Sequence, residues 1–209
     1  MSNPFLEIPL EIYEKHMSLD SVYQLQTLNE IMRAQLNHYD VSTSMILGVA
    51  GGNGLEHIDI NKIDVIYGVD INYKYLEACR QRHSYLGSNF KEICVNLTEL
   101  TAILPKSDLI IANLFIEYIG YEAFICHVEK ICPKYISVVI QINIGDEFVS
   151  DSPYIHNFDR VAEVHHHIEA TELKQSLRRI GYSCVLNEEY PLPNGKLFQR
   201  FDFKSGSSF

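Results

Sequence analysis

Residues 44–57 read SMILGVAGGNGLEH. A short apolar run is followed by a stretch with four glycines within seven positions, 48–54. The apolar run has the length and composition of a short buried strand. Glycine has no Cβ and tolerates positive φ, so the backbone of the turn after this strand can come very close to a ligand. In doubly wound sheets such a turn lies at the carboxyl edge of the first strand, where ligands bind. The stretch therefore predicts a strand followed by a binding turn.

Strand and helix patterns alternate on both sides of this turn. Short apolar runs predict further strands at 64–70, 89–96, 108–113 and 135–143. Helical spacing predicts helices at 7–38, 72–86, 117–132 and 169–182, a short helix at 97–104, and a weak helix or turn at 55–62. The strands are near-continuous apolar runs, which is typical of a parallel sheet covered on both faces.

The end of the chain has a different pattern. Asn194-Gly195 lies between two runs rich in strand-forming residues, which predicts a β-hairpin. Together the patterns predict an α/β fold with a doubly wound, seven-stranded and mostly parallel sheet. We expect an antiparallel hairpin at its C-terminal end and helices on both of its faces.

Charge and composition argue against several classes of partner. The 209 residues include 17 Lys and Arg against 27 Asp and Glu, a net charge of −10. Binding to duplex DNA needs clustered basic residues, so we expect no DNA partner. No apolar run reaches the length of a membrane span and the N-terminal residues lack a signal-peptide pattern, so we predict a cytoplasmic protein with no membrane partner. The five cysteines show no disulfide or zinc-ribbon spacing.

Asp70 ends the second predicted strand and indicates the kind of ligand. A carboxylate at this point can accept hydrogen bonds from both hydroxyls of a ribose, as in adenosine-like ligands. Dinucleotide-binding proteins need the pattern G-x-G-x-x-G, but if Gly52 and Gly54 are the first two glycines, the third position is His57. Residues 55–62 also carry two early acids, which makes a poor site for a pyrophosphate. An NAD-dependent enzyme is therefore the less favoured interpretation.

From about residue 40 to residue 203 the chain resembles the class I S-adenosylmethionine-dependent methyltransferases. The resemblance rests on the order of five features: the strand with its turn Ala50-Gly51-Gly52-Asn53-Gly54, Asp70, the strand followed by Asn96-Leu97, the segment 108–119, and the terminal hairpin. It implies a Rossmann-like methyltransferase domain over residues 41–209. Residues 1–40 would then form an N-terminal helical cap, which in this superfamily often folds over the cofactor as a lid.

The resemblance also implies a site for S-adenosylmethionine. Its methionine part would pass Gly48, Ala50, Gly52, Asn53 and Gly54, and Asp70 would hold the ribose. Ile71 would pack on the adenine, Asn96 would reach its exocyclic amine, and Leu97 would supply a backbone amide. Asn113 would face the methyl group and the substrate. Gly48 stands where the family has an acid that helps to hold the cofactor's amino group, and Ala50 replaces the first glycine. The amino group must then be met differently, for example by backbone carbonyls.

Methyl transfer from a sulfonium depends mainly on proximity and orientation, sometimes with a base for the nucleophile. Glu117 and Tyr118, which follow the fourth strand, and His16 in the N-terminal helices are the candidate catalytic residues, with Tyr13 beside them. Glu117 is equally explained by its favourable position at a helix N-terminus. His16 and Tyr13 are equally explained as exposed polar residues of an amphipathic helix. Asn113 is not in an N-P-P-Y or D-P-P-Y setting, which argues against amino methylation of DNA bases.

Residues 164–169 read VHHHIE and raise the question of a metal. Three consecutive histidines cannot all point to one side of a helix or strand, and no complete ligand set accompanies them, so we predict no metal site. The surrounding segment 144–168 is long, and long loops in compact domains are often functional. It is expected to form one wall of the acceptor pocket with His165, His166 and His167 as candidates, or else to be a variable surface insertion.

These observations predict a methyltransferase that uses S-adenosylmethionine on a small-molecule acceptor. One alternative is a methyltransferase acting on protein or RNA, which a basic or strongly concave docking face would favour. Another is a catalytically inactive, cofactor-binding protein of the same fold, which Gly48 favours. The acceptor atom is not identified, and the oligomeric state is left open between monomer and dimer.

Overall fold

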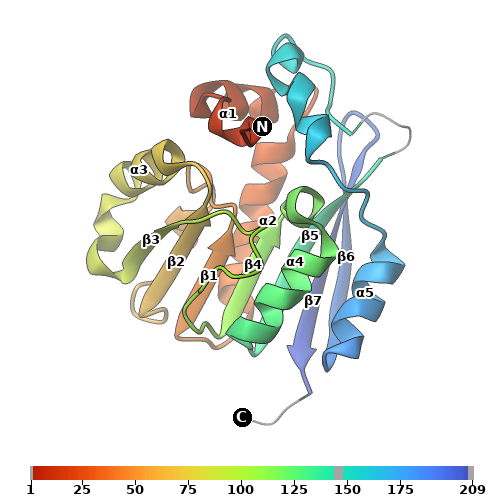
Figure 1. Cartoon of the computed structure of the whole chain (residues 1–209). Helices are drawn as coiled ribbons and strands as arrows, with labels where there is room; N and C mark the ends of the chain where they lie inside the picture. The colour runs from red at the N-terminus through yellow and green to blue at the C-terminus, as the bar shows by residue number, and fades with distance from the viewer. Residues whose placement is uncertain (1, 144–147, 207–209) are drawn as a thin grey trace.

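The computed structural model describes residues 2–143 and 148–206. Within these residues, seven strands form one sheet in the order β3-β2-β1-β4-β5-β7-β6 (Figure 1). Strands β1 to β5 run parallel to one another, whereas β7 lies antiparallel between β5 and β6. The predicted sheet with its C-terminal hairpin is therefore confirmed. The strands are β1 (Thr43–Leu47), β2 (Val65–Asp70), β3 (Phe90–Cys94), β4 (Leu109–Asn113), β5 (Tyr135–Ile142), β6 (Tyr182–Pro191) and β7 (Leu197–Ser205).

Helices cover both faces of the sheet (Figure 1). One face carries α2 and α3, and the other carries α4 and α5. The α-helices are α1 (Leu10–Ser18), α2 (Gln24–His38), α3 (Tyr73–Arg82), α4 (Ile116–Ile131) and α5 (Ala170–Arg179); short 3₁₀ helices are η1 (Pro4–Leu6), η2 (Leu55–His57), η3 (Ser84–Asn89) and η4 (Ile155–Glu163). No helix among the described residues is long and apolar enough to cross a membrane.

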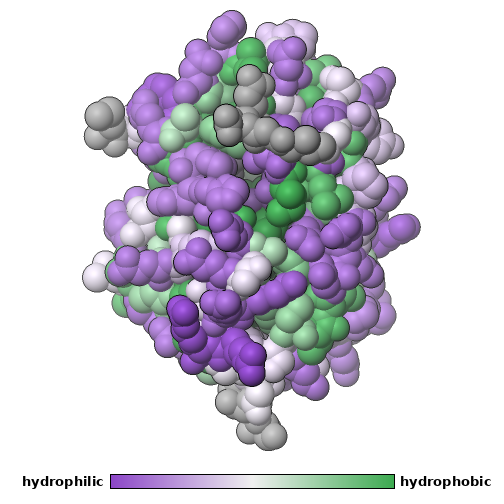
Figure 2. Space-filling model, turned by 90° about the vertical axis from the view of Figure 1, so that its right-hand side faces the viewer, coloured by the Kyte–Doolittle hydropathy of each residue, from purple (hydrophilic) through white to green (hydrophobic). Residues whose placement is uncertain are grey.

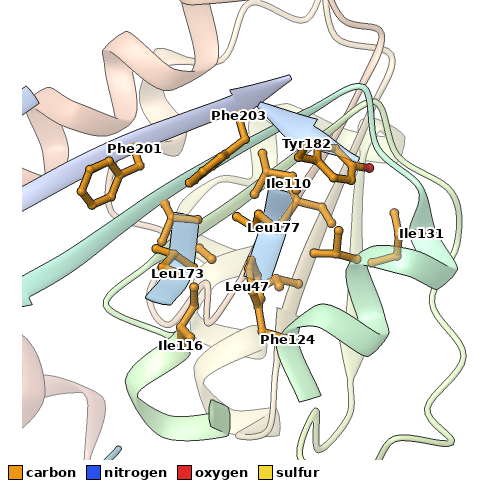
Figure 3. Close-up of a cluster of buried hydrophobic side chains, with 14 of the residues drawn as sticks. Leu47, Ile110, Ile116, Phe124, Ile131, Leu173, Leu177, Tyr182, Phe201 and Phe203 are labelled. Atoms are coloured by element: carbon orange, nitrogen blue, oxygen red, sulfur yellow. The ribbon is translucent and has the colours of Figure 1, made fainter. Parts of the chain in front are cut away.

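The core lies on the two faces of the central strands. Alternate residues of β1 belong to different clusters, because successive side chains of a strand point to opposite faces. Met45 and Leu47 pack with α4 and α5, and Ile46 packs with α2 and α3. Figure 3 shows the first of these clusters, with Phe124 of α4 and Leu173 of α5 against the sheet. Figure 2 views the side of the hairpin and α5, where polar side chains cover most of the surface between smaller apolar patches.

The strand order places a crevice between β1 and β4. After β1 the chain builds β2 and β3 on one side, and then returns to build β4 and β5 on the other. Ligands of doubly wound sheets bind at such a reversal, outside the carboxyl ends of the strands. Above these ends lie α1 and the segment that contains η4 (Figure 1). The fold thus positions a covered crevice at the end of β1.

The helix predicted over residues 7–38 is wrong in its extent, because the chain breaks between α1 and α2. The backbone amides of Val22 and Tyr23 both donate to the carbonyl of Leu19, and Tyr23 adopts a left-handed φ of 54°. Val22 lies in this turn and is fully buried, so it has the apolar side chain that a continuous helix would also show there. The helical spacing of apolar residues therefore did not reveal the turn. We call η1 and α1 the lid; α1 lies above the carboxyl ends of the strands (Figure 1), whereas α2 packs into the core with Met32 and Leu36.

The short helix predicted at 97–104 is also wrong, since the structure has turns there. The side chain of Asn96 accepts hydrogen bonds from the backbone and hydroxyl of Thr98, which favours a turn over a helix. Ile103 is 92% exposed, so its apolar side chain does not pack against the sheet. The helix predicted at 72–86 ends earlier, at Arg82, and Gly87 with a φ of 51° interrupts the 3₁₀ turn that follows.

Candidate functional site

A cavity with an empty volume of about 700 Å³ lies at the carboxyl ends of β1, β2, β3 and β4, and we call it the strand-end cavity. Its floor comes from the strand ends and its cover from η1 and α1. Seven of the residues expected at a cofactor site line it together: Gly48, Ala50, Asp70, Ile71, Asn96, Leu97 and Asn113. Asn3, Phe5 and Tyr13 line it from the lid. The sheet order brings these strand ends together.

A second cavity, of about 560 Å³, lies along the glycine turn, and we call it the glycine-loop cavity. Gly48, Ala50, Gly51 and Asn53 line it, opposite Glu14 of α1. Gly52 and Gly54 are not among its lining residues. Their φ values of 84° and 88° show that they shape the turn, because L side chains rarely adopt this region.

The glycine turn is attached to β2 by hydrogen bonds. The amides of Gly48 and Val49 donate to the carbonyl of Val69, over 2.8 and 3.1 Å. The amide of Ala50 donates to the Asp70 Oδ2 atom at 2.9 Å. Ala50 itself has a φ of 46°, a strained conformation for a residue with a Cβ. Asp70 therefore holds the turn in shape as well as lining the cavity beside it.

Gly54 is predicted to tolerate alanine poorly for two separate reasons. Its φ is 88°, and an added Cβ would lie 2.5 Å from Cγ and 2.6 Å from Cβ of Met32 in α2. Gly87 also has a positive φ, but an added Cβ there meets nothing within 4 Å. Gly87→Ala should therefore cost about 1–2 kcal/mol of unfolding free energy from φ alone, and Gly54→Ala about 2–4 kcal/mol. Urea unfolding of both variants measures the difference, and equal losses would show that Met32 yields without cost.

Asp70 is 8% exposed and sits between donors. Its Oδ1 atom accepts from the amide of Asn72 at 2.8 Å, and its Oδ2 atom accepts from Ala50. Burial raises the pKa of Asp70 above its ordinary value, and the backbone N–H donors oppose this rise. A carboxylate oxygen accepts more than one hydrogen bond, so both oxygens retain capacity for a ligand.

Two amide side chains line the strand-end cavity with part of their hydrogen bonding already used. The Asn96 Oδ1 atom accepts from Thr98, so a hydrogen bond from this side chain to a ligand falls to its Nδ2 donor. Asn113 and the buried Gln35 form a reciprocal amide pair, with Nε2 to Oδ1 at 2.8 Å and Nδ2 to Oε1 at 2.9 Å. Asn113 is thereby fixed in orientation. His127 Nε2 lies 2.9 Å from the carbonyl oxygen of Leu97 and fixes the backbone of this lining residue.

A third cavity of about 710 Å³ lies under α1 and η4, and we call it the cap cavity. All three candidate catalytic residues, His16, Glu117 and Tyr118, line it. It shares Phe5, Tyr13, Leu114 and Tyr118 with the strand-end cavity. Tyr13 lines all three cavities, so they meet at this side chain.

Glu117 is the buried carboxyl of the cap cavity. It lies in the first turn of α4 and is 5% exposed. Its Oε1 atom accepts from the amide of Gln141 at 3.1 Å, while its Oε2 atom has no hydrogen-bond partner among the described residues. Burial raises the pKa of Glu117 to about 7. A carboxyl of this kind can accept a proton near neutral pH.

His16 is 3% exposed, so it is not the exposed polar residue that its helix pattern also allowed. Its Nδ1 atom lies 2.7 Å from the hydroxyl oxygen of Ser152, and its ring packs on Phe158 with the centroids 4.5 Å apart. Burial lowers the pKa of His16 to about 4, so the imidazole is neutral at pH 7. These contacts attach α1 to the segment that carries η4.

Two of the three consecutive histidines, His165 and His167, line the cap cavity, and His166 does not. The ring of His165 lines the cap cavity and stacks on Phe148, with a centroid distance of 3.9 Å. The amide of His166 donates to the carbonyl of Glu117 at 2.6 Å, and the side chain of His167 is 79% exposed. Within the described part of the chain, no group of three His, Cys, Asp or Glu residues is placed to hold a metal ion. The part of segment 144–168 at 144–147 lies outside the described residues.

Sequence reasoning missed an ion pair across the glycine turn. Arg82 of α3 donates to Glu14 of α1, with Nη2 2.8 Å from Oε2. The pair lies directly over Gly51, whose missing Cβ would be 2.3 Å from Glu14 Oε1 and 2.5 Å from Arg82 Nη1. A Cβ at Gly51 would therefore displace the ends of these two flexible side chains. The partners are 68 residues apart in sequence, and no local spacing relates them.

No protein-family model and no curated protein sequence matches this chain. Solved structures do match its fold. The N-methyltransferase NodS from Bradyrhizobium japonicum WM9, in complex with S-adenosyl-L-homocysteine, is 13% identical and has a TM-score of 0.68, over 99% of this chain and 100% of that one. Magnesium protoporphyrin IX methyltransferase (ChlM) from Synechocystis PCC 6803, with the same ligand, is 9% identical with a TM-score of 0.64, over 97% and 96%.

A structure with another activity also matches. The [4+2]-cyclase SpnF is 11% identical and has a TM-score of 0.64, over 87% of this chain and 82% of that chain. One fold thus carries different chemistries, and function must be argued from the site. In sheet order, terminal hairpin and placement of the crevice, this chain has the Rossmann-like fold of the class I S-adenosylmethionine-dependent methyltransferases.

Proposed function

We propose that the protein transfers a methyl group from S-adenosylmethionine to a small-molecule acceptor. The observation that carries this proposal is the position of Asp70. Its buried carboxylate lies at the end of β2, lines the strand-end cavity, and is bonded to the backbone of the glycine turn beside it. Solved structures of the same fold hold S-adenosylhomocysteine, which supports a nucleoside ligand of this type here.

The three cavities fit the parts of this reaction. In the strand-end cavity, Asp70 would hold the ribose hydroxyls, and Ile71 and Leu97 would contact the adenine. The Asn96 amide would then donate to a ring nitrogen, since its oxygen is occupied by Thr98. The methionine part would lie in the glycine-loop cavity. The acceptor would enter the cap cavity, whose junction with the strand-end cavity at Leu114 and Tyr118 is where the methyl group would be transferred.

When bound, the cofactor supplies an electrophilic methyl group on a sulfonium with an activated leaving group. The protein's part is to align the acceptor with this methyl group, which alone lowers the barrier greatly. The lid and the η4 segment cover the acceptor site and limit the entry of water. Glu117, which lines the cap cavity, would accept a proton from the nucleophile. The covered cavity also favours a small molecule over a protein or RNA as acceptor.

Glu14 would take the role of the acid that is absent at Gly48. Its carboxylate lines the glycine-loop cavity and lies against Gly51, where the amino group of the methionine part would be. We expect Glu14→Gln to weaken binding of S-adenosylhomocysteine about tenfold, because a hydrogen bond to a charged group is lost. Glu11→Gln, an exposed substitution on the same helix, should leave binding unchanged. Titration calorimetry measures both affinities.

A second ligand separates recognition of the amino group from a general effect on the lid. 5′-Methylthioadenosine has the nucleoside and the sulfur but no amino acid part. Its affinity should be equal for the parent protein and for Glu14→Gln. An equal loss for both ligands would mean that Glu14 acts by holding α1 through Arg82, and the assignment of the amino group would be wrong.

The proposal as a whole is tested by calorimetric titration with S-adenosylmethionine, S-adenosylhomocysteine and NAD. We expect dissociation constants in the micromolar range for the two sulfur nucleosides, about −8 kcal/mol, and no heat from NAD. Absence of binding by both sulfur nucleosides would overturn the proposal. Binding of both without methyl transfer to any acceptor class would favour the alternative of an inactive cofactor-binding protein.

A further inference from the structure

The cap cavity combines aromatic walls with one buried carboxyl. Its aromatic lining residues come from the lid, from α4 and from the η4 segment: Phe5, Tyr13, Tyr118, Phe148 and Phe158. Phe5 and Tyr118 pack edge to face with their centroids 4.7 Å apart. Among the described lining residues there is no lysine or arginine, and Glu117 is the only carboxyl. Histidines aside, the described part of the lining therefore offers no cationic side chain for a carboxylate, phosphate or sulfate.

Hydrogen bonding in this cavity leaves an acceptor without a donor. The amide nitrogen of Gln24 donates to Gln141, whose own amide nitrogen donates to Asn143 and to the carbonyl of Phe148. These donors are thus used within the wall of the cavity. Glu117 Oε2, in contrast, is buried without a partner among the described residues. An unpaired buried acceptor is costly, so the complementary ligand brings a donor of its own.

We propose that the acceptor is an amine carried on a flat apolar body, bound in the cap cavity with its nitrogen at Glu117. A hydroxyl also brings a donor, but an ammonium group matches both a desolvated carboxylate and aromatic faces, which attract cations. The carboxyl that is half ionised near pH 7 in the free protein becomes fully ionised beside an ammonium group. This inference rests on the proposed methyl transfer for its reaction, and on the cavity alone for its binding.

The charged and titratable groups around Glu117 are compatible with a cationic ligand. From α1 and the η4 side, His16 has a pKa lowered to about 4, and the pKa of His165 is also lowered by burial and by its neighbouring histidines. Tyr118 and Tyr121 of α4 have raised pKa values and stay neutral. Lys196, near His16, donates to the carbonyl of Phe148 at 2.7 Å. Its ammonium is thereby bonded to the backbone of the wall, and Lys196 is not among the described residues that line the cavity.

The reaction balances with the groups named. The ammonium form of the acceptor gives one proton to the Glu117 carboxylate, which leaves a neutral amine with a free lone pair. This pair forms the new N–C bond, the C–S bond breaks, and its electrons stay on sulfur as a neutral thioether. The product is a methylated ammonium, and Glu117 returns its proton to solvent when the product leaves. No further reactant is needed.

The test compares three probes that share one carbon skeleton: 2-phenylethylamine, 2-phenylethanol and phenylacetate. Each is titrated into the full chain, alone and saturated with S-adenosylhomocysteine. We expect the amine to bind at least tenfold more tightly than the alcohol and the acid. Glu117→Gln should abolish this preference, whereas Glu122→Gln, the same change at an exposed position of the same helix, should keep it. An alcohol or acid that binds as well as the amine, or a preference that survives Glu117→Gln, overturns the inference.

Binding of S-adenosylhomocysteine and preference for the amine test different proposals. If S-adenosylhomocysteine does not bind but the amine preference depends on Glu117, the proposed function fails and the inference about the cavity holds. If S-adenosylhomocysteine binds and the amine has no preference, the inference fails and the proposed function stands. The two proposals therefore fail in different ways.

A pH series on the unchanged protein decides the question if Glu117→Gln does not fold. The Glu117 carboxyl becomes ionised as pH rises through about 7, whereas an alkyl ammonium keeps its proton up to about pH 10. Affinity for 2-phenylethylamine should therefore rise about tenfold from pH 6 to pH 8. Affinity for 2-phenylethanol should stay nearly constant. An amine affinity that does not rise with pH overturns the inference.

Discussion

Asp70→Ala is expected to abolish detectable binding of S-adenosylhomocysteine, a loss of at least about 100-fold in affinity. Each ribose hydroxyl would lose a hydrogen bond to a charged acceptor, worth about 1.5–3 kcal/mol. The amides of Ala50 and Asn72 would also lose their acceptor, so the glycine turn would lose one of its links to β2 and keep those from Gly48 and Val49 to Val69. Two such bonds alone exceed the roughly 2.7 kcal/mol that corresponds to 100-fold. Calorimetric titration of the variant measures the loss.

Matched variants separate the ligand effect from a folding effect. Asp64 lies just before β2, at its opposite end, and is exposed, so Asp64→Ala should bind as the parent protein does. Asp70→Asn keeps the shape and one acceptor oxygen, and we expect an intermediate loss. Thermal unfolding verifies that each variant is folded. Retained affinity in a folded Asp70→Ala protein would contradict the assignment of the ribose to this carboxylate.

Asp202→Ala should lower the unfolding free energy by about 3–5 kcal/mol, the largest stability effect that we predict. Asp202 is fully buried on β7 and pairs with Arg200, whose side chain is 1% exposed. Its oxygens also accept from the hydroxyls of Tyr39 and Ser137. Removing the carboxylate leaves the two hydroxyls without their acceptor and the buried guanidinium with only the longer contact to Glu188, at 3.8 Å. Such a loss is a large part of the total stability of a domain of this size.

Urea unfolding tests this prediction against an exposed pair. Glu11 and Lys15 of α1 form an ion pair with side chains 75% and 51% exposed, and Glu11→Ala should cost less than about 1 kcal/mol. Replacing both members of the buried pair, as in Arg200→Met with Asp202→Leu, should cost much less than Asp202→Ala alone. A loss below about 1 kcal/mol for Asp202→Ala would contradict the prediction and show that Glu188 or water replaces the carboxylate at Arg200.

The residues of the strand-end cavity could be predicted because they follow directly from strand ends. Asp70, Asn96 and Asn113 each follow an apolar run, and parallel strands bring such positions to one edge of the sheet. The glycines could be interpreted from the sequence as well, because a positive φ or a close approach of the backbone favours glycine over other residues. Local patterns were sufficient wherever one element alone fixed the position.

The rest depends on contacts between distant elements. Glu14 with Arg82, and Gln35 with Asn113, pair across 68 and 78 residues, and each partner alone reads as a polar residue of a helix or strand end. The helix predicted over 7–38 failed because a buried Val22 kept the period through a turn. The burial of His16 and Glu117 could not be predicted, because residues of α1, α4 and the η4 segment, which are distant in sequence, surround them together.

The meeting of three cavities at Tyr13 has an evolutionary consequence. Under the proposed function, a smaller side chain at position 13 would enlarge the acceptor cavity and also weaken binding of the cofactor. Such a change would therefore impair two steps of the function at once. Phe158 and Val161 line only the cap cavity. Substitutions there can alter the size of the acceptor without touching the cofactor. Descendants of this chain that diverge in acceptor should therefore vary first in the η4 segment and keep position 13 unchanged.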